Sequence, residues 1–157
     1  MTQYSPKLIV LIACVSKKKS IKVKAKDLYI SPLFTNSLAY ANALHPDKIF
    51  ILSALHHLLD PEKEIGPYNV TLSNVPKNKR KSGLKVLNSS EKRLWGEKVI
   101  DMLTKESDLK HDKFIILAGN EYIKPIKEKL VNYEVPLEGI SLFNRVRVLK
   151  ALLMSTS

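Results

Sequence analysis

An unbroken apolar run near the start of the chain, Leu8 to Ala13, constrains the fold more than any other feature. A short run of this kind is typical of a strand that is buried on both faces, as in a parallel sheet. Polar residues follow it directly, namely Cys14, Ser16 and a lysine triplet at 17–19. Ligands of open α/β sheets bind at the carboxyl ends of the strands, so these residues are the first candidates for a site.

Two further apolar runs, at residues 49–52 and 114–118, end in the same way. The first is followed by Ser53, His56 and His57, and the second by Gly119, Asn120 and Tyr122. The carboxyl ends of parallel strands meet at one edge of a sheet. We therefore expect these polar residues to share one site.

Amphipathic segments between and after these strands predict four helices. Ser31 is the expected N-cap of the first, with Pro32 at its first position, and Ser89 or Ser90 that of the second. Asn120 is expected to cap the third, the last covers residues 141–154, and residues 133–137 form a short fourth strand. This order predicts one domain over residues 1–157, a three-layer α/β/α domain with a small, mainly parallel sheet of three to four strands.

Residues 54–89 show no clear period and form a long connection, which in a compact domain is usually functional. We expect its first half, through Tyr68 and Leu72, to pack near the site. The basic half, residues 76–88, is expected to be flexible in the free protein.

The net charge of +11 is concentrated in two segments. Residues 17–26 hold six lysines and residues 77–85 hold five lysines and arginines, with no acidic residue in either. The remaining 15 Lys and Arg equal the 15 Asp and Glu. This favours a polyanionic partner over a merely solvated surface, and it predicts salt-dependent binding. The nucleic-acid-binding candidates are Lys17, Lys18, Lys19, Lys22, Lys79, Arg80 and Lys81.

Several other classes are disfavoured by the sequence. A single cysteine excludes an internal disulfide and suits a reducing cytoplasm, and no apolar run reaches the ~18 residues of a membrane span. The glycine-rich motifs of phosphate-loop and dinucleotide-binding proteins are absent, and adjacent histidines make a poor metal site. We therefore expect a cytoplasmic protein with no cofactor, no metal and no membrane partner. The oligomeric state is left open.

Each candidate side chain has a structural and a functional interpretation. Cys14 is either a small buried apolar residue or a thiol activated by the lysines that follow it. His57, like His56, can act as an acid or a base. Tyr68 either stacks on a base or holds the long connection in place, and Asn120 either caps a helix or binds substrate. The catalytic candidates are Cys14, Ser16, His57, Asn69 and Asn120, and the substrate-binding candidates are Ser53, Tyr68, Gly119 and Tyr122.

These residues lie in motifs that resemble a known pattern. Residues 13–18, 25–34, 52–59, 67–69 and 117–122 resemble an uncharacterised bacterial, archaeal and phage family. Its motifs are Cys-Ser-Lys-Lys, Ala-x-x-Leu-Tyr-x-Ser-x-x-Phe, Leu-Ser-Ala-x-x-Gly-Leu-Leu, Pro-Tyr-Asp and Leu-Ala-Gly-x-x-Tyr. The first two elements also look like the uracil-DNA-glycosylase-like domain of archaeosine synthase. In this chain, His57 replaces the family's usual glycine, and Asn69 replaces the aspartate that would activate water.

The resemblance implies a nucleobase-handling site on a three-layer sheet, acting on DNA, RNA or a phosphorylated nucleoside. One hypothesis is therefore a nucleobase- or nucleoside-processing enzyme, such as an N-glycosidase or a base-modifying or base-exchange enzyme. A second is a non-catalytic, basic nucleic-acid-binding domain. A third is a small domain whose lysines bind a free phosphorylated metabolite.

Overall fold

A computed structural model describes residues 4–156 of the chain. Its centre is a five-stranded sheet in the order β4-β3-β1-β8-β9. The strands are β4 (His57–Leu59), β3 (Lys48–Ser53), β1 (Leu8–Ala13), β8 (Lys113–Leu117) and β9 (Tyr133–Glu134). Four of them are parallel, whereas β4 pairs antiparallel with β3 at the edge. The sheet exceeds the three to four strands expected because β4, which folds back directly after β3, adds a strand.

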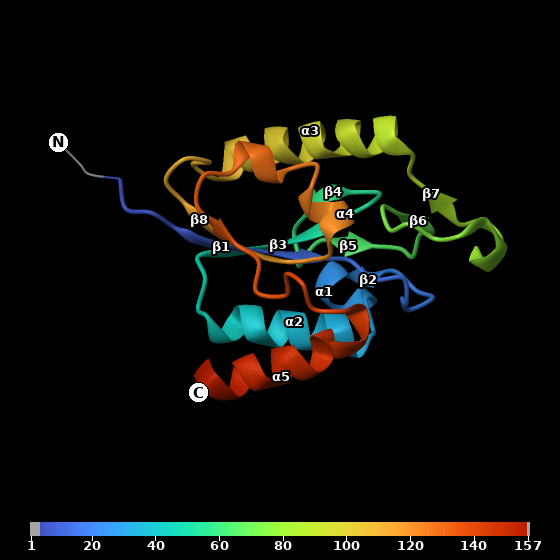
Figure 1. The fold of residues 1–157 in the computed structure, drawn as a ribbon, viewed down its shortest axis with the longest axis horizontal. Helices are drawn as coiled ribbons and strands as arrows, with labels where there is room; N and C mark the ends of the chain where they lie inside the picture. The colour runs from blue at the N-terminus through green and yellow to red at the C-terminus, as the bar shows by residue number, and fades with distance from the viewer. Residues whose placement is uncertain (1–3, 157) are drawn as a thin grey trace.

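Helices cover both faces of this sheet, as the three-layer prediction requires (Figure 1). α3 (Ser89–Glu106) lies on one face, and α2 (Pro32–Ala43) and α5 (Arg145–Thr156) lie side by side on the other. The side chains of β1 alternate between two hydrophobic cores. Ile9 and Leu11 pack with α3, and Val10 and Ile12 pack with α2 and α5. β1 is thus buried on both faces, as its unbroken apolar sequence predicted.

The helix starts follow local capping chemistry. The Ser31 hydroxyl accepts a hydrogen bond from the backbone N–H of Phe34 at the start of α2, as predicted. α3 is capped by Asn88, which forms a capping box with Glu91, so the expected caps Ser89 and Ser90 were wrong by one or two positions. An asparagine amide oxygen serves this role as well as a serine hydroxyl.

The third predicted helix is much shorter than expected. α4 spans Asn120–Ile123 and is followed by a 3-10 turn, η2 (Lys127–Lys129). Pro125 has no backbone N–H to continue the helix. The residue at the cap position is Gly119, so the expectation that Asn120 caps this helix was wrong. Gly96 of α3 contacts Pro125 so closely that no side chain would fit there, and this fixes α3 beside α4.

The remaining short elements gather at the carboxyl ends of the central strands (Figure 1). They are β2 (Val23–Lys24), α1 (Ala25–Leu28), β5 (Glu64–Ile65), β6 (Val70–Thr71), η1 (Lys77–Lys79) and β7 (Lys85–Val86), while η3 (Leu142–Asn144) precedes α5. Tyr68 and Leu72 are buried, so the first half of the long connection packs against the core. This end of the sheet therefore holds both the loop after β1 and most of the long connection after β3.

Candidate functional site

Three residues that follow the central strands lie in one row. β1 pairs with β3 in the register Ala13–Leu52, and with β8 in the register Ile12–Leu117. The Cys14 N–H continues the ladder by donating to the Leu52 carbonyl at 3.0 Å. Continuing this register places Ser53, Cys14 and Gly119 side by side on three adjacent strands. The three strand ends therefore meet at one edge, where open α/β sheets bind their ligands.

A buried hydroxyl network covers the Ser53 end of this row. Ser53 Oγ and Tyr68 OH are 2.7 Å apart, and Tyr68 OH and Tyr29 OH are 2.5 Å apart. The His56 backbone N–H donates to Ser53 Oγ at 3.0 Å. Burial raises the pKa of both tyrosines well above the ordinary value, so both phenols stay protonated at physiological pH. The network can therefore supply neutral hydrogen-bond donors rather than a base.

Lys18 is the member of the lysine triplet that points inward. Its backbone forms an isolated bridge with Tyr29, and the neighbouring Lys17 and Lys19 are exposed. The Lys18 ammonium lies 4.4 Å from the centre of the Tyr68 ring, in cation–π geometry. Burial lowers the pKa of Lys18, and an electrostatic interaction with Cys14 opposes this shift. The structure thus places Lys18 inside the strand-end cluster and Lys17 and Lys19 outside it.

Cys14 and Tyr122 meet between β1 and β8. Cys14 Sγ is 3.5 Å from Tyr122 OH, which also accepts a hydrogen bond from the Leu72 backbone N–H at 3.4 Å. Burial raises the pKa of Tyr122. The Tyr122 ring packs edge-on against Trp95, and Lys18 covers the Tyr68 ring. The hydroxyls of both tyrosines, rather than their rings, are therefore presented to neighbouring polar groups.

The two histidines lie in different surroundings. The centre of the His56 ring is 5.4 Å from that of the Tyr68 ring. Burial lowers the pKa of His56, and the positive charge of Lys63 lowers it further. Burial lowers the pKa of His57, and the positive charge of Lys98 in α3 lowers it further. The structure therefore places the His56 ring against Tyr68 of the hydroxyl network. His57, at the start of β4, instead experiences the positive charge of Lys98 in α3.

Three other candidates lie at the surface. Ser16 is exposed, and its carbonyl accepts a hydrogen bond from the Lys18 ammonium. Asn69 is exposed, and its carbonyl accepts from the Lys85 N–H. Asn120 is exposed and lines a separate cavity of about 330 Å³ beside β9. The structure thus forms two pairs on neighbouring strands, Cys14 with Tyr122 and Ser53 with Tyr68, and it leaves these three residues outside both pairs.

Sequence reasoning missed Arg145, the first residue of α5. Its guanidinium lies so close to Gly119 that a β-carbon there would be 3.3 Å from Nη1, and its Nε donates to the Ile140 carbonyl at 3.2 Å. The contact joins segments that are far apart in the chain. The absence of a side chain at Gly119 was the one local signal.

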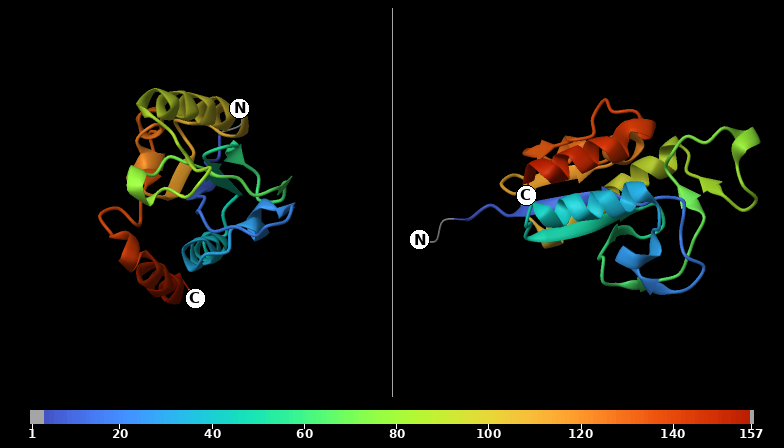
Figure 2. Two further views of the ribbon diagram at one scale, coloured as in Figure 1. Left: turned by 90° about the vertical axis from the view of Figure 1, so that its right-hand side faces the viewer. Right: turned by 90° about the horizontal axis from the view of Figure 1, so that it is seen from below.

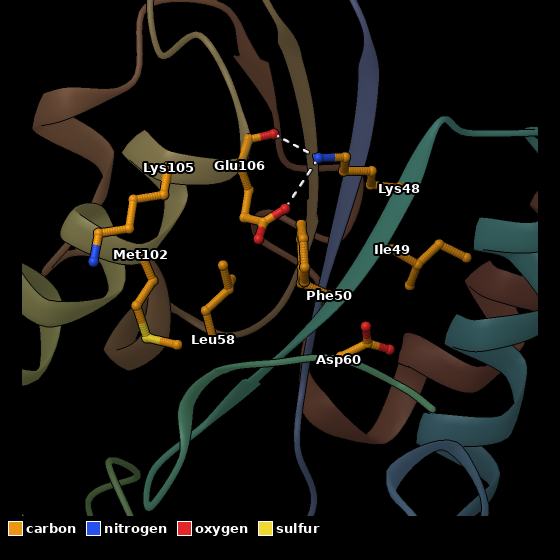
Figure 3. A pocket seen from close by; sticks show the side chains of 8 residues that line it. All are labelled: Lys48, Ile49, Phe50, Leu58, Asp60, Met102, Lys105 and Glu106. Carbon is orange, nitrogen blue, oxygen red and sulfur yellow. Dashed lines mark hydrogen bonds and ion pairs between the residues drawn. The ribbon is translucent and has the colours of Figure 1, made fainter. Parts of the chain in front are cut away.

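A larger cavity, of about 530 Å³, lies elsewhere. It is lined by the first half of β3, the end of α3 and residues of the β4 region (Figure 3). Lys48 of its wall is paired with Glu106 at 3.1 Å. The cavity lies along the open edge of β3 and contains none of the predicted site residues, so it carries no part of the candidate site.

The basic segments flank the strand ends, one on either side (Figure 2). Glu62 pairs with Lys24 and Lys26, and Glu91 pairs with Lys85. Across residues 4–156, the cations of these two segments without a carboxylate partner include Lys17, Lys19, Lys22, Lys79, Arg80 and Lys81. The predicted nucleic-acid contacts, apart from Lys18, thus remain available at the surface.

Residues 4–156 contain no cluster of three or more His, Cys, Asp or Glu side chains able to hold a metal ion. Within the same range, no helix combines the length and the apolarity that crossing a bilayer requires.

Comparison with known proteins identifies the family. A model of a family of unknown function, DUF6884, matches residues 9–151. The chain belongs to this family. It is also 36% identical over 86 residues to a UPF0246 protein of Psychrobacter cryohalolentis, an alignment that covers 54% of this chain and 30% of that protein.

Two further relatives are similarly distant. A UPF0246 protein of Shewanella halifaxensis is 34% identical over 86 residues, which is 54% of this chain and 31% of that protein. Another, of Saccharophagus degradans, is 31% identical over 94 residues, which is 59% of this chain and 34% of that protein. The chain therefore spans about a third of the length of these curated relatives. No solved structure matches it significantly.

Proposed function

We propose that this protein binds nucleic acid and processes a nucleobase or nucleoside at the carboxyl ends of β1, β3 and β8. The observation that carries the proposal is the row of Ser53, Cys14 and Gly119, which lies under neutral hydroxyl donors between two exposed basic segments. The resemblance to a glycosylase-like domain agrees with this arrangement. The lysines would hold the phosphate chain, while the strand ends would receive a base extruded from the stack.

The chemistry suited to this network is stabilisation of a departing base. When an N-glycosidic bond breaks, the base leaves with the electron pair of that bond, and hydrogen-bond donors stabilise the charge that develops. Ser53 and Tyr68 hold such donors in a buried position. Water supplies the hydroxyl for the sugar carbon, and its proton goes to the leaving base.

One observation favours the non-catalytic alternative. Within the described part of the chain, no carboxylate is hydrogen-bonded to the hydroxyl network. The exposed Asp60 carboxylate accepts from the Glu62 backbone N–H, and Glu64 is exposed in β5. Since activation of water usually needs a base, a purely nucleic-acid-binding module is the second candidate function.

Salt-dependent binding tests the shared part of both candidates. We expect fluorescence anisotropy to show that oligonucleotide affinity falls steeply with salt, with a log–log slope of about 0.7–0.9 per phosphate contact. Replacing Lys17, Lys19, Lys22, Lys79, Arg80 and Lys81 by Gln in two triple variants should reduce affinity and slope. A control triple variant at Lys110, Lys129 and Lys150, which are exposed and remote from these segments, should keep both. Wild-type affinity in both of the first two triple variants, as in the control, would reject the proposal.

Formation of abasic sites separates the two candidates. Oligonucleotides that contain uracil or modified bases are incubated with the protein, and abasic sites are revealed by alkaline cleavage. If the protein is an enzyme, S53A and Y68F should release base more slowly while binding the oligonucleotide normally. Unchanged turnover in H57A and N120A would remove those two residues from the catalytic set. Full affinity without base release on any substrate favours the binding module.

A further inference from the structure

The guanidinium of Arg145 lies at the carboxyl end of β8, against Gly119. Its Nε donates to the Ile140 carbonyl at 3.2 Å, which fixes the plane of the group. Nη1 and Nη2 lie against the Gly119 backbone, at 3.3 and 3.5 Å from the position that a β-carbon would take. Among the described residues, neither of these nitrogens donates a hydrogen bond to a protein acceptor. Arg145 is half-buried.

Gly119 makes this position possible. Strand alternation directs residue 119 to the same face of the sheet as Leu117, which is the face covered by α2 and α5. α5 begins at the carboxyl end of the sheet and runs back along it (Figure 1). A side chain at position 119 would occupy the space between the strand end and the first residue of that helix. Glycine leaves the space to the guanidinium.

The row of strand ends thus has a positive charge at each side. Lys18 lies over the Tyr68 ring, and Arg145 lies on Gly119. The register continued from β1 and β8 sets Cys14 beside Gly119. This point is also where the chain order of the sheet reverses, because β3 lies on one side of β1 and β8 on the other. Crevices at such points are the usual ligand sites of open α/β sheets.

We infer that Arg145 binds a phosphate group of the substrate at this edge of the sheet, with its two Nη atoms donating to two phosphate oxygens. An arginine fork matches phosphate in this bidentate manner, which a lysine cannot reproduce. The identity of the anion as a substrate phosphate rests on the proposed function. The anion site itself rests on the geometry of Arg145 and Gly119 alone. The exposed lysines would then bind the flanking chain, and Arg145 the nucleotide that enters the site.

Phosphate binding to matched variants tests this inference. Inorganic phosphate is titrated by isothermal calorimetry into the wild-type chain, R145Q, R145K and R147Q, in chloride buffer at constant ionic strength. Arg147 is exposed on the same helix two residues away, so R147Q carries the same charge change. We expect R145Q to bind phosphate about tenfold to a hundredfold more weakly, R145K to be intermediate, and R147Q to match the wild type. Circular dichroism confirms that each variant is folded.

Two further measurements keep the inference separate from the proposed function. G119A should weaken phosphate binding severalfold, because its methyl group displaces the guanidinium. The two lysine triple variants should keep the phosphate site while losing oligonucleotide affinity. If R145Q and R147Q bind phosphate equally, or if the lysine variants lose phosphate and R145Q does not, the inference is overturned. Arg145-dependent phosphate binding without oligonucleotide binding would uphold the anion site and reject the proposed function.

Discussion

Two histidines, His45 and His57, have backbone φ angles of 51° and 66°. Side chains other than glycine are strained in this left-handed region by about 1–2 kcal/mol. His57 closes the tight connection between β3 and β4, where glycine would adopt the same backbone angle without strain. The position is thus constrained by its backbone whether or not the imidazole has a chemical role.

Replacing His57 by glycine should relieve this strain, but glycine also loses more conformational entropy on folding. The net effect should be a stabilisation of up to about 1 kcal/mol. Urea denaturation measures the change. H45G is the matched control, because His45 is exposed just after α2, far from the strand ends. Both variants should gain stability, and if His57 acts in catalysis then H57G alone should lose turnover. A destabilised H57G would contradict this account.

Ser53 holds the hydroxyl network together, since its Oγ is bonded to Tyr68 OH and to the His56 N–H. Ser53 is fully buried, so S53A leaves these partners without water to replace the lost hydroxyl. We expect a loss of about 1–3 kcal/mol in the free energy of unfolding, measured with urea. Ser37 of α2 is also buried, and alanine suits a helix interior, so S37A should cost much less. Equal losses in S53A and S37A would show that the hydrogen bonds of Ser53 add no stability beyond that of any buried serine.

At the scale of elements, Asp112 ties β1 to the turn before β8. Its buried carboxylate accepts hydrogen bonds from the Lys7 and Asp108 backbone N–H groups and from Tyr4 OH. Burial alone would raise the pKa of Asp112, but these hydrogen bonds outweigh it and lower the pKa below its usual value. The bond to Asp112 in turn raises the pKa of Tyr4 to about 12.

This arrangement predicts a pH-dependent stability. Because the folded-state pKa of Asp112 is lowered, its contribution is complete above the unfolded value of about 3.9 and is lost as pH falls through the folded value. D112N should cost about 1–3 kcal/mol at pH 7 and should flatten the stability curve below pH 4. Urea midpoints between pH 3 and pH 7 measure this. An unchanged acid limb in D112N would assign the dependence to other carboxylates.

Element formation was predictable where its cause is local. The apolar runs predicted β1, β3 and β8 to within a residue at each end. A strand that is buried on both faces is an unbroken apolar run, which can be recognised without knowing its neighbours in the sheet. β4 escaped prediction, since His57–Leu59 is a strand through its pairing with β3. The meeting of the strand ends followed from parallel order. The Tyr29–Tyr68 bond and the Arg145–Gly119 contact join distant segments, and only the folded chain shows them.

At the scale of the whole molecule, two hydrophobic cores share one sheet. The core beneath α3 contains Trp95 and Leu103, and the core beneath α2 and α5 contains Leu149. The strands between them contribute alternate side chains to both cores, so loss of either core should destabilise the other. A single domain over residues 1–157 remains a prediction, and its test is whether the two cores unfold together.

Trp95, the one tryptophan in the chain, reports on the α3 core alone, whereas circular dichroism reports on all the helices. L149A removes a fully buried side chain from the opposite core and should cost about 2–5 kcal/mol. If the chain is one cooperative unit, Trp95 fluorescence and circular dichroism should shift to the same lower urea midpoint. L103A, which removes a side chain from the core that contains Trp95, should also shift both signals to one lower urea midpoint. A Trp95 transition that stays in place while the helical signal moves would show that α2 and α5 unfold separately, and that the sheet does not couple its two faces.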